Sequence, residues 1–460
     1  MRKSVLFSVF LFVVALLFGN FALANELFVG TKDGFASVTE AVKAAKAGDT
    51  IFIATGVYQE PVETYPIEIN LPVSLIGDSG VVLKGPPYKP LLRVTSPDVS
   101  IENVDFHLLR WGIVNTGDRL SLMDCRFTLS DAKHRISSSG VWLAGVYDCH
   151  IANCEFVGCG ICIAGPPISE QSEGLPVLTG LFEVGEDVAL FTSHTLINNR
   201  INNKPLYYFA NEADLTVPLD AGGLIAAGCA NITVQGVDVS DNSMGIQMIY
   251  CSDARVVDVT ADRCGIFGVY VAKSDRPVLQ GVSCTESNHG VDLRAVQSGF
   301  VTECETLRCE QGIFLSFATD CIVDSCSVTG GGNGLFIASG AQNQLSGNTI
   351  EGSSNGLYCQ GERDVLVCGN TFLNNSAAGL RLLRSSGQVL TNSFLENWVG
   401  TMVAESGPIT IWNNRFESNQ CTGLYLRDVF SGKVSFNTFE NTGLADLEME
   451  GSLIDTLVLE

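Results

Sequence analysis

Four cysteines and one histidine lie within the fifteen residues DCHIANCEFVGCGIC, from Asp148 to Cys162. Thiolate sulfur and imidazole nitrogen are the ligands that zinc, copper and iron favour in proteins. Within this stretch, His150, Cys159 and Cys162 are the three residues that could converge on one metal ion. Whether they do so depends on the structural elements that carry them.

The second half of the chain is organised by a repeat. From about residue 231, a glycine followed by alternating apolar residues recurs every 21 to 23 residues. A fixed period in this range is typical of a solenoid, and the period-2 apolar pattern predicts strands rather than helices. We therefore predict a right-handed parallel β-helix with coils of about 22 residues, about fourteen coils and roughly 65 Å in length. Examples of these glycines are Gly245, Gly290, Gly312, Gly334, Gly356, Gly379 and Gly423.

The same register accounts for most of the cysteines. Asn370 and Asn348 share one inward row, whose earlier coils place Cys326, Cys304, Cys154 and Cys125 there, alternating with valines. Cys359 falls on a second inward row, and Cys229 and Cys251 lie 22 residues apart, as stacked turn residues would. Inward asparagines in register can form an amide ladder, whereas inward cysteines act as small buried hydrophobic residues. The sulfur is therefore mostly architectural.

The N-terminal region predicts export and a cap. Arg2 and Lys3 precede an apolar run that ends in Ala22-Leu23-Ala24, which is the pattern of a secretory signal peptide. Further on, Ser37-x-x-Glu40 is a capping box that opens a short amphipathic helix, suited to cover the open end of a β-helix. The predicted organisation is a signal peptide at 1–24, an N-terminal cap at 25–71 with its helix at 37–47, first coils at 72–164, an insertion at 165–222, and regular coils at 223–460.

Net charge limits the classes of partner. The sequence holds 27 Lys+Arg and 50 Asp+Glu, and loss of Arg2 and Lys3 with the signal peptide leaves a balance of about −25. Such a surface repels phosphate backbones and anionic membranes. Nucleic acid is therefore excluded as the expected partner, and no later apolar run is long enough for a membrane span in the mature chain. Cations, cationic proteins and neutral or polar glycans remain.

Three segments together resemble the NosD-type periplasmic β-helix proteins. They are SVTEAVKAAKAGDTIFIATGVY near the N-terminus, NNKPLYYFANEADLTVPLDAGGLIAAGCANITVQG at 202–236, and the train of NNxF…GL coils. The resemblance implies a periplasmic or cell-surface location. For the namesake of the family it also implies delivery of copper to nitrous oxide reductase beside an ABC transporter. Copper is thus a cofactor expectation that comes from the resemblance alone.

The residues themselves give little support to a copper site. The chain has six Met and five His, with no His-x-His or Met-x-Met cluster. Cys154 is inward by the ladder register, and His150 is expected on the other side of a coil from Cys159 and Cys162. The candidate metal ligands are nevertheless His150, Cys159 and Cys162.

An aromatic stripe is the main candidate for ligand binding. The residues two after successive marker glycines are Phe314, Phe336 and Tyr358, which would stand on one exposed face at the spacing of the coils. Asp292 and Arg294 lie one coil before them, and Arg381 lies one coil after. Aromatic faces flanked by hydrogen-bonding groups can bind sugar rings; alternatively, the rings stack on one another. From the KPLYY element of the insertion, the candidates are Lys204, Tyr207 and Tyr208.

Catalysis is possible but not indicated by the sequence. β-Helix lyases and hydrolases need grouped carboxylates, and the outward row beside the asparagines is a strip of Ser and Thr with isolated charges. The remaining acidic candidates are Glu212, Asp214 and Asp220 of the insertion. The sequence therefore predicts an exported binding protein for a carbohydrate or a protein partner. The alternatives are a copper-delivery accessory protein for a periplasmic metalloenzyme and a carbohydrate-active lyase or hydrolase.

Overall fold

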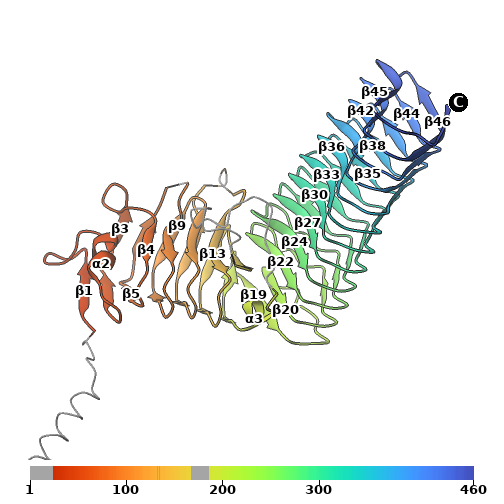
Figure 1. Ribbon diagram of the computed structural model, residues 1–460. Helices are drawn as coiled ribbons and strands as arrows, with labels where there is room; N and C mark the ends of the chain where they lie inside the picture. The colour runs from red at the N-terminus through yellow and green to blue at the C-terminus, as the bar shows by residue number, and fades with distance from the viewer. Residues whose placement is uncertain (1–23, 87, 132, 134, 167–185, 460) are drawn as a thin grey trace, which may run out of the picture.

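Stacked coils form two straight arms that meet at a bend (Figure 1). The structure is a computed structural model that describes residues 24–86, 88–131, 133, 135–166 and 186–459. Arm one spans residues 26–201 and arm two spans residues 204–459, with the bend at β19 (Lys204–Ala210). Within each arm the strands pair in parallel with their equivalents in the next coil, and β18 and β19 pair antiparallel at the bend; the predicted β-helix is confirmed. The predicted signal peptide lies outside the described residues, apart from Ala24.

Arm one has three parallel sheets, one on each side of its coils. Sheet A contains β1 (Glu26–Val29), β2 (Thr50–Ile53), β5 (Ser74–Gly77), β8 (Ser100–Glu102), β11 (Ser121–Met123), β14 (His150–Ala152) and β17 (Thr195–Ile197). Sheet B contains β3 (Gly56–Gln59), β6 (Val81–Lys84), β9 (Asp105–Leu108), β12 (Arg126–Leu129), β15 (Glu155–Val157) and β18 (Arg200–Ile201). Sheet C contains β4 (Ile67–Ile69), β7 (Leu92–Val94), β10 (Trp111–Asn115), β13 (Ser139–Ala144) and β16 (Ile161–Ala164).

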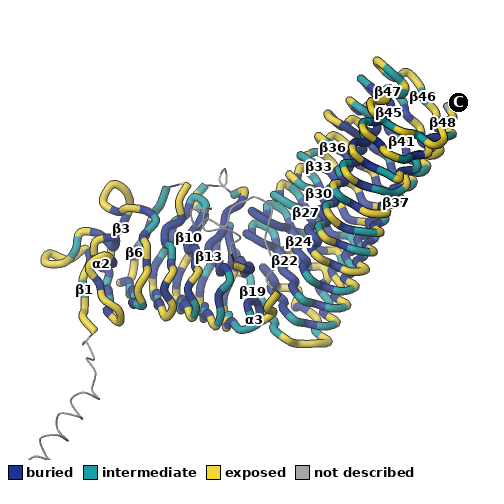
Figure 2. The backbone as a smooth tube through the Cα atoms, viewed as in Figure 1, coloured by how far each residue is buried: buried dark blue, intermediate teal, exposed yellow. Residues whose placement is uncertain are grey.

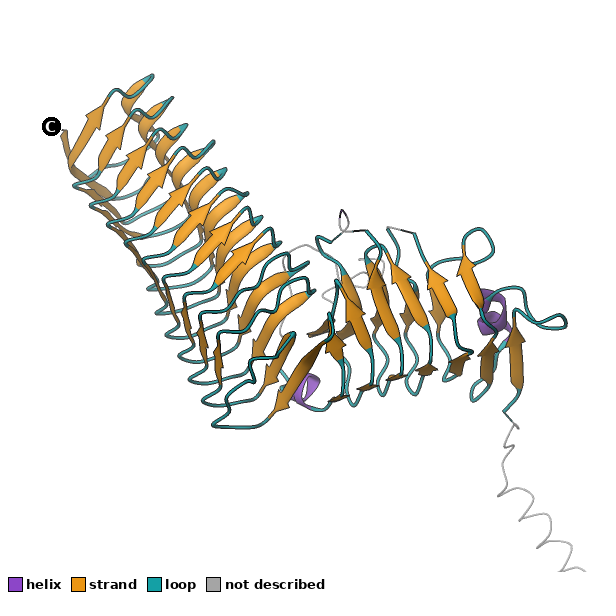
Figure 3. Cartoon of the chain, turned by 180° about the vertical axis from the view of Figure 1, so that it is seen from behind, coloured by secondary structure: helices purple, strands orange, loops and turns teal. Residues whose placement is uncertain are grey.

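Arm two continues with three sheets of its own, seen from behind in Figure 3. Sheet D contains β19, β20 (Gly223–Ala227), β22 (Met244–Ile249), β24 (Phe267–Ala272), β27 (His289–Arg294), β30 (Gln311–Ser316), β33 (Asn333–Ala338), β36 (Asn355–Gln360), β39 (Ala378–Leu383), β42 (Val399–Ala404), β45 (Thr422–Arg427) and β47 (Ala445–Glu450). Sheet F contains β21 (Thr233–Gln235), β23 (Arg255–Val257), β25 (Val278–Gln280), β28 (Phe300–Thr302), β31 (Ile322–Asp324), β34 (Gln344–Ser346), β37 (Val365–Cys368), β40 (Gly387–Leu390), β43 (Ile409–Trp412), β46 (Gly432–Glu440) and β48 (Thr456–Leu459). Sheet G contains β26 (Ser283–Thr285), β29 (Glu305–Leu307), β32 (Ser327–Thr329), β35 (Thr349–Glu351), β38 (Thr371–Leu373), β41 (Ser393–Leu395) and β44 (Arg415–Glu417), and ends on β46.

The solenoid is longer than the sequence predicted, with about 19 turns of about 22 residues rather than about fourteen. The additional turns lie at β1 and β2, which precede the expected first coil, and within 195–217. This second region belongs to the predicted insertion 165–222, yet β17 and β18 pair in register with β14 and β15. Asn199 explains the continuity, because its side chain accepts the Cys154 N–H at 3.0 Å, as an asparagine-ladder residue does. Residues 167–185 of that segment are not among those described.

The predicted N-terminal helix is present as α2 (Val38–Ala44) at the free end of arm one (Figure 1). The Ser37 hydroxyl accepts the Glu40 N–H at 3.1 Å, which is the N-cap contact that the capping box predicts. Val38, Ala41 and Val42 are buried, so the predicted apolar face packs inward. The other helix that the structure describes is the single turn α3 (Ala189–Thr192). In the described ranges, no helix has the length and apolar character needed to cross a bilayer.

The inward rows follow the predicted register. From Asn348 onward, each ladder asparagine donates its backbone and side-chain N–H groups to the side-chain oxygen of the next at 2.9–3.0 Å, and Cys326 donates its N–H to Asn348 in the same way. Beside them, the rings of Phe372, Phe394, Phe416 and Phe439 stack at 4.9–5.0 Å. Cys125, Cys154, Cys304, Cys326 and Cys359 are buried, which confirms them as core residues. Figure 2 shows buried segments recurring in the coils of both arms.

Side chains of arm two hydrogen-bond to the free edge of arm one. β16 is the last strand of sheet C, so one edge of its backbone has no strand partner among the residues that the structure describes. The Ser243 hydroxyl accepts the Gly160 N–H at 2.8 Å. Gln247 accepts the Ile163 N–H at 3.3 Å and donates to the Ile163 carbonyl. These contacts satisfy backbone groups that would otherwise be buried without partners or left open to edge pairing.

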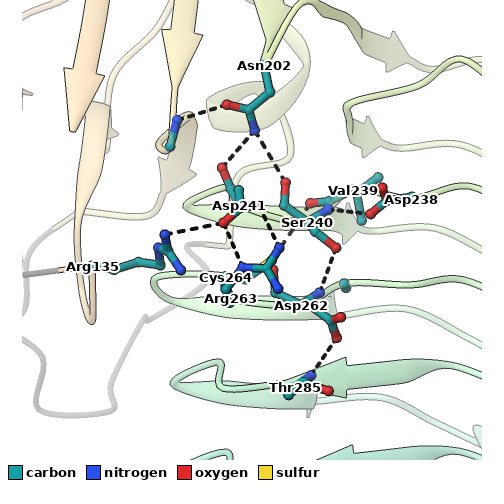
Figure 4. Close-up of polar contacts among 12 residues, drawn as sticks. Arg135, Asn202, Asp238, Val239, Ser240, Asp241, Asp262, Arg263, Cys264 and Thr285 are labelled. Atoms are coloured by element: carbon teal, nitrogen blue, oxygen red, sulfur yellow. Dashed lines mark hydrogen bonds and ion pairs between the residues drawn. The ribbon is translucent and has the colours of Figure 1, made fainter. Parts of the chain in front are cut away.

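A second set of polar contacts joins the arms at the bend (Figure 4). Asn202 accepts the Gly158 N–H of arm one and donates to the Asp241 carbonyl of arm two, both at 2.9 Å. The Asp241 carboxylate pairs with Arg263 at 2.7 Å and with Arg135 of arm one at 3.3 Å. The two arms are therefore joined by side-chain hydrogen bonds and ion pairs as well as by the chain itself.

Candidate functional site

The predicted aromatic stripe lies on the outward face of sheet D, on the inner side of the bend (Figure 1). Phe314, Phe336 and Tyr358 are in register on β30, β33 and β36, and Arg381 follows on β39. Phe336, Tyr358 and Arg381 are half-buried, whereas Phe314 is only 7% exposed. The stripe thus emerges into solvent from β33 onward.

The rings of the stripe present their edges, not their faces, to solvent. Phe336 and Tyr358 stack with centroids 5.0 Å apart and planes inclined by 15°, and Phe314 meets Phe336 edge-on at 5.2 Å. The guanidinium of Arg381 covers the other face of Tyr358 at 4.8 Å from the ring centroid. Of the two alternatives that the sequence left open, stacking of the rings on one another is the one observed, because rings at coil spacing are close enough to stack.

Asp292 and Arg294 are buried, although both were expected on an exposed face. Arg294 donates to Asp292 through Nε at 2.8 Å and through Nη2 at 3.0 Å, and the Asp292 side chain is fully buried. The Arg294 guanidinium also lies over the rings of Phe267 and Phe314, at 5.3 Å and 5.2 Å from their centroids. In the preceding coil, Phe267 and Tyr270 belong to a buried cluster shared with arm one, and the repeat pattern alone does not indicate this packing.

His289 completes this cluster and was missed as a site residue. Its Nδ1 lies 2.7 Å from Asp292 Oδ2, and its ring meets Phe267 and Phe314 edge-on at 5.1 Å and 5.3 Å. Burial would raise the pKa of the Asp292 carboxyl, but the charge of Arg294 and the hydrogen bonds from His289 and Arg294 outweigh it and lower that pKa. Asp292 is therefore ionised and can only accept, so His289 Nδ1 carries a proton and donates it to Asp292. The signal in the sequence is a His three residues before an Asp on one strand.

A row of side-chain amides runs beside the aromatic stripe and was also missed. Gln311, Asn333 and Asn355 are in register with His289, each just before a marker glycine. Asn355 donates to Asn333 at 2.9 Å, and Asn333 donates to Gln311 at 3.1 Å. Each amide has two N–H donors and an oxygen with two lone pairs, so the row keeps hydrogen-bonding capacity for a ligand. We call this surface, from His289 to Arg381, the concave face.

The KPLYY residues do not join the concave face. Tyr208 shares the row of the stripe, but five coils before Phe314, and its hydroxyl donates to the Phe191 carbonyl at 2.7 Å. Tyr207 donates to Asp220 at 2.9 Å. Lys204 pairs with Asp238 at 3.1 Å beside the bend contacts of Figure 4, where a groove of about 680 Å³ opens.

The charged groups that line the groove at the bend are already held by the protein. Asp241 pairs with Arg263, Asp238 pairs with Lys204, and Asp262 accepts the Thr285 N–H at 2.8 Å. Of the acidic candidates in the predicted insertion, Asp220 accepts from Tyr207 and Asp214 accepts from Asn231 at 2.7 Å. These carboxylates serve internal contacts, so the concave face is the stronger candidate site.

The candidate metal ligands lie on different sheets. Cys162 is on β16 and is completely buried at the bend, where the Ser139 hydroxyl donates to its sulfur at 3.4 Å. Cys159 precedes β16 and its thiol contacts the Phe127 carbonyl at 3.7 Å, whereas His150 lies on β14 of sheet A. Burial raises the pKa of the Cys162 thiol to about 12 and raises the pKa of the Cys159 thiol further. Within the described parts of the chain, no three His, Cys, Asp or Glu side chains are grouped to hold a metal ion.

Two family models match the sequence. The model described as "Periplasmic copper-binding protein (NosD)" matches residues 197–378, and the model described as "Protein of unknown function (DUF1565)" matches residues 24–265. The second match covers more than half of the chain. No curated protein gives a match to the sequence.

Several solved structures are similar at low identity. The periplasmic alginate epimerase AlgG is 10% identical, with 90% of this chain and 86% of that chain covered and a TM-score of 0.35. The family 28 exopolygalacturonase of Yersinia enterocolitica is 9% identical, with 95% of this chain and 78% of that chain covered and a TM-score of 0.32. The A-module of the Azotobacter vinelandii mannuronan C-5 epimerase AlgE4 is 12% identical, with 90% of this chain and 91% of that chain covered and a TM-score of 0.24.

Replacing Asp292 with Asn should destabilise the protein strongly. The substitution removes the carboxylate that pairs with the buried Arg294 guanidinium, and breaking a buried ion pair costs about 3–5 kcal/mol in the free energy of unfolding. Folding lowers the pKa of Asp292. Its ionised carboxylate therefore stabilises the folded state fully above the ordinary carboxyl pKa, and this stabilisation is lost as the pH falls through the lower pKa of the folded state. Urea unfolding measures the change. The exposed pair Arg384–Glu405, at 2.8 Å, supplies the control: Glu405→Gln should leave the unfolding midpoint unchanged. Equal midpoints for Asp292→Asn and the unsubstituted protein would contradict the assignment.

The buried thiols should neither react with thiol reagents nor bind Cu(I) tightly in the folded protein. Fourteen of the sixteen cysteines are buried, and only Cys368 and Cys421 are partly exposed. We expect a thiol reagent to label at most these two until the chain is unfolded, and an anaerobic Cu(I) titration against a chromophoric competitor to show no tight binding. Tight stoichiometric binding that disappears in a Cys159→Ser/Cys162→Ser variant would contradict this prediction and support copper delivery.

Proposed function

We propose that this chain is an exported binding protein for a neutral polysaccharide. It belongs to the family described as "Protein of unknown function (DUF1565)" and is a NosD-like parallel β-helix. The ligand lies along the concave face, on the amide row and the stripe beside it. The location is supported by the family described as periplasmic and by the predicted signal peptide.

The amide row is the observation that carries this proposal. Sugar hydroxyls both donate and accept, and side-chain amides can do both at one site. Gln311, Asn333 and Asn355 repeat at the coil spacing of roughly 4.8 Å, which is close to the advance of one sugar unit along an extended glycan. The ring edges of Phe336 and Tyr358 supply apolar contact next to the row. A site with a few fixed polar groups beside aromatic side chains is typical of ligand recognition.

Charge favours a neutral glycan over an anionic one. The mature chain carries a balance of about −25, which repels polyanions at long range. From β27 to β45, all outward positions of sheet D are described and Asp292 is their one carboxylate, buried in its pair with Arg294. This face therefore does not supply the pair of accessible carboxylates that glycoside hydrolysis needs. Binding of a glycan is favoured over its hydrolysis.

A double substitution Asn333→Ala/Asn355→Ala should weaken polysaccharide binding. Each lost hydrogen bond is worth about 0.5–1.5 kcal/mol, so the loss of two should raise the dissociation constant at least about fivefold. Affinity gel electrophoresis measures it, with dextran, laminarin, glucomannan and xyloglucan as neutral probes and alginate as an anionic probe. Retention is expected on at least one neutral probe.

The matched control uses two polar residues on another sheet of the same coils. Ser327 and Thr349 are outward on β32 and β35 of sheet G, in register with each other, and their replacement by Ala should not alter retention. Equal loss in both double variants, with both folded by circular dichroism, would argue against the concave face. Retention by alginate alone would contradict the neutral ligand.

A further inference from the structure

The concave face is closed at one end. Along the row of the stripe, the coils before Phe314 carry Asp292, Tyr270 and Gln247, which are 0%, 2% and 1% exposed. Gln247 hydrogen-bonds to the backbone of β16 in arm one, two coils before Asp292. Toward the other end, Phe336, Tyr358, Arg381 and Met402 are all partly exposed. A chain that lies along the row can therefore extend toward the C-terminal coils but is stopped by arm one.

Apolar packing makes this end a wall and not a movable contact. Met244, Phe267 and Tyr270 of arm two belong to the same buried cluster as Trp142 and Cys162 of arm one. The edge hydrogen bonds of Gly160 and Ile163 lie beside this cluster. Opening the wall would expose several large side chains and leave the edge of β16 unsatisfied, which would be costly in free energy.

His289 stands at the end of the amide row, beside this wall. Its Nδ1 is occupied by Asp292, whereas none of the described residues hydrogen-bonds to its Nε2. The side chain keeps 12% of its surface exposed. In the neutral ring Nε2 is an acceptor, and its direction is fixed by the Asp292–Arg294 pair behind it. An oriented acceptor at the closed end of a glycan-binding face is suited to a hydroxyl of a terminal sugar.

We propose that the concave face binds the end of a polysaccharide chain, not its middle, with the terminal sugar at His289. The inference rests on the proposed function and specifies its ligand. The terminal sugar lies between the wall and Phe314, its hydroxyl donates to His289 Nε2, and the following sugars extend over Gln311, Asn333 and Asn355. Each polysaccharide chain then offers one binding site for the protein, whatever the length of the polysaccharide.

The number of binding sites per gram of polysaccharide tests this proposal. The retained neutral polysaccharide is cut by partial acid hydrolysis into size fractions, and isothermal titration calorimetry gives the stoichiometry for each fraction. Chain-end binding predicts that fractions ten times shorter bind about ten times more protein per gram. A constant or falling number of sites per gram, with binding retained, would overturn the chain-end inference and leave the proposed function standing. No retention of any neutral probe would overturn both.

Substitution of His289 tests the residue assigned to the terminal sugar. His289→Phe removes the acceptor but keeps a ring between Phe267 and Phe314, and should weaken binding of short fragments at least fivefold. His289→Gln keeps an acceptor in line with Gln311 and should bind within about twofold of the unsubstituted protein. Unchanged affinity of a folded His289→Phe variant would contradict the placement of the terminal sugar at His289.

Discussion

The hydrogen bonds between arm two and the free edge of β16 determine the shape of the molecule. A parallel β-helix ends in strands whose backbone groups have no partner, and natural proteins cover such edges. Here Ser243 and Gln247 supply side-chain partners to Gly160 and Ile163, so the last coil of sheet C ends against the outward face of sheet D. A second solenoid segment can then begin at an angle to the first, with an inner side that is enclosed at the bend.

This enclosure gives one row of residues several roles. In a straight solenoid, equivalent positions have the same environment in every coil, because each coil contacts only its neighbours. Along the row of the stripe, Gln247 bonds to arm one, Tyr270 packs in the shared core and Asp292 forms a buried ion pair. The row is buried from Gln247 to Phe314 and faces solvent again from Phe336 onward. The functional surface is thus the part of a regular row that the other arm leaves uncovered.

The features that repeat could be predicted from the sequence, and those that depend on the bend could not. The period placed Asn348, Cys326 and Cys154 on one inward row, as the ladder contacts confirm. The sequence carries no signal for the roles of Ser243 and Gln247, because nothing in a repeat indicates a contact with a distant coil. The burial of Asp292 and Arg294 was missed for that reason. The amide row was missed because the position before each marker glycine is polar in some coils and apolar in others.

Footprinting with hydroxyl radicals tests the central claim that the concave face holds the ligand. Oxidation of individual side chains is compared by mass spectrometry with and without the retained polysaccharide. A ligand on the concave face should reduce the oxidation of Phe336, Tyr358 and Met402. It should leave the oxidation of Trp412 and Phe430 unchanged, because these two residues are exposed outside sheet D. Protection of Trp412 or Phe430 without protection of Tyr358 would show that the ligand binds elsewhere and would contradict the account.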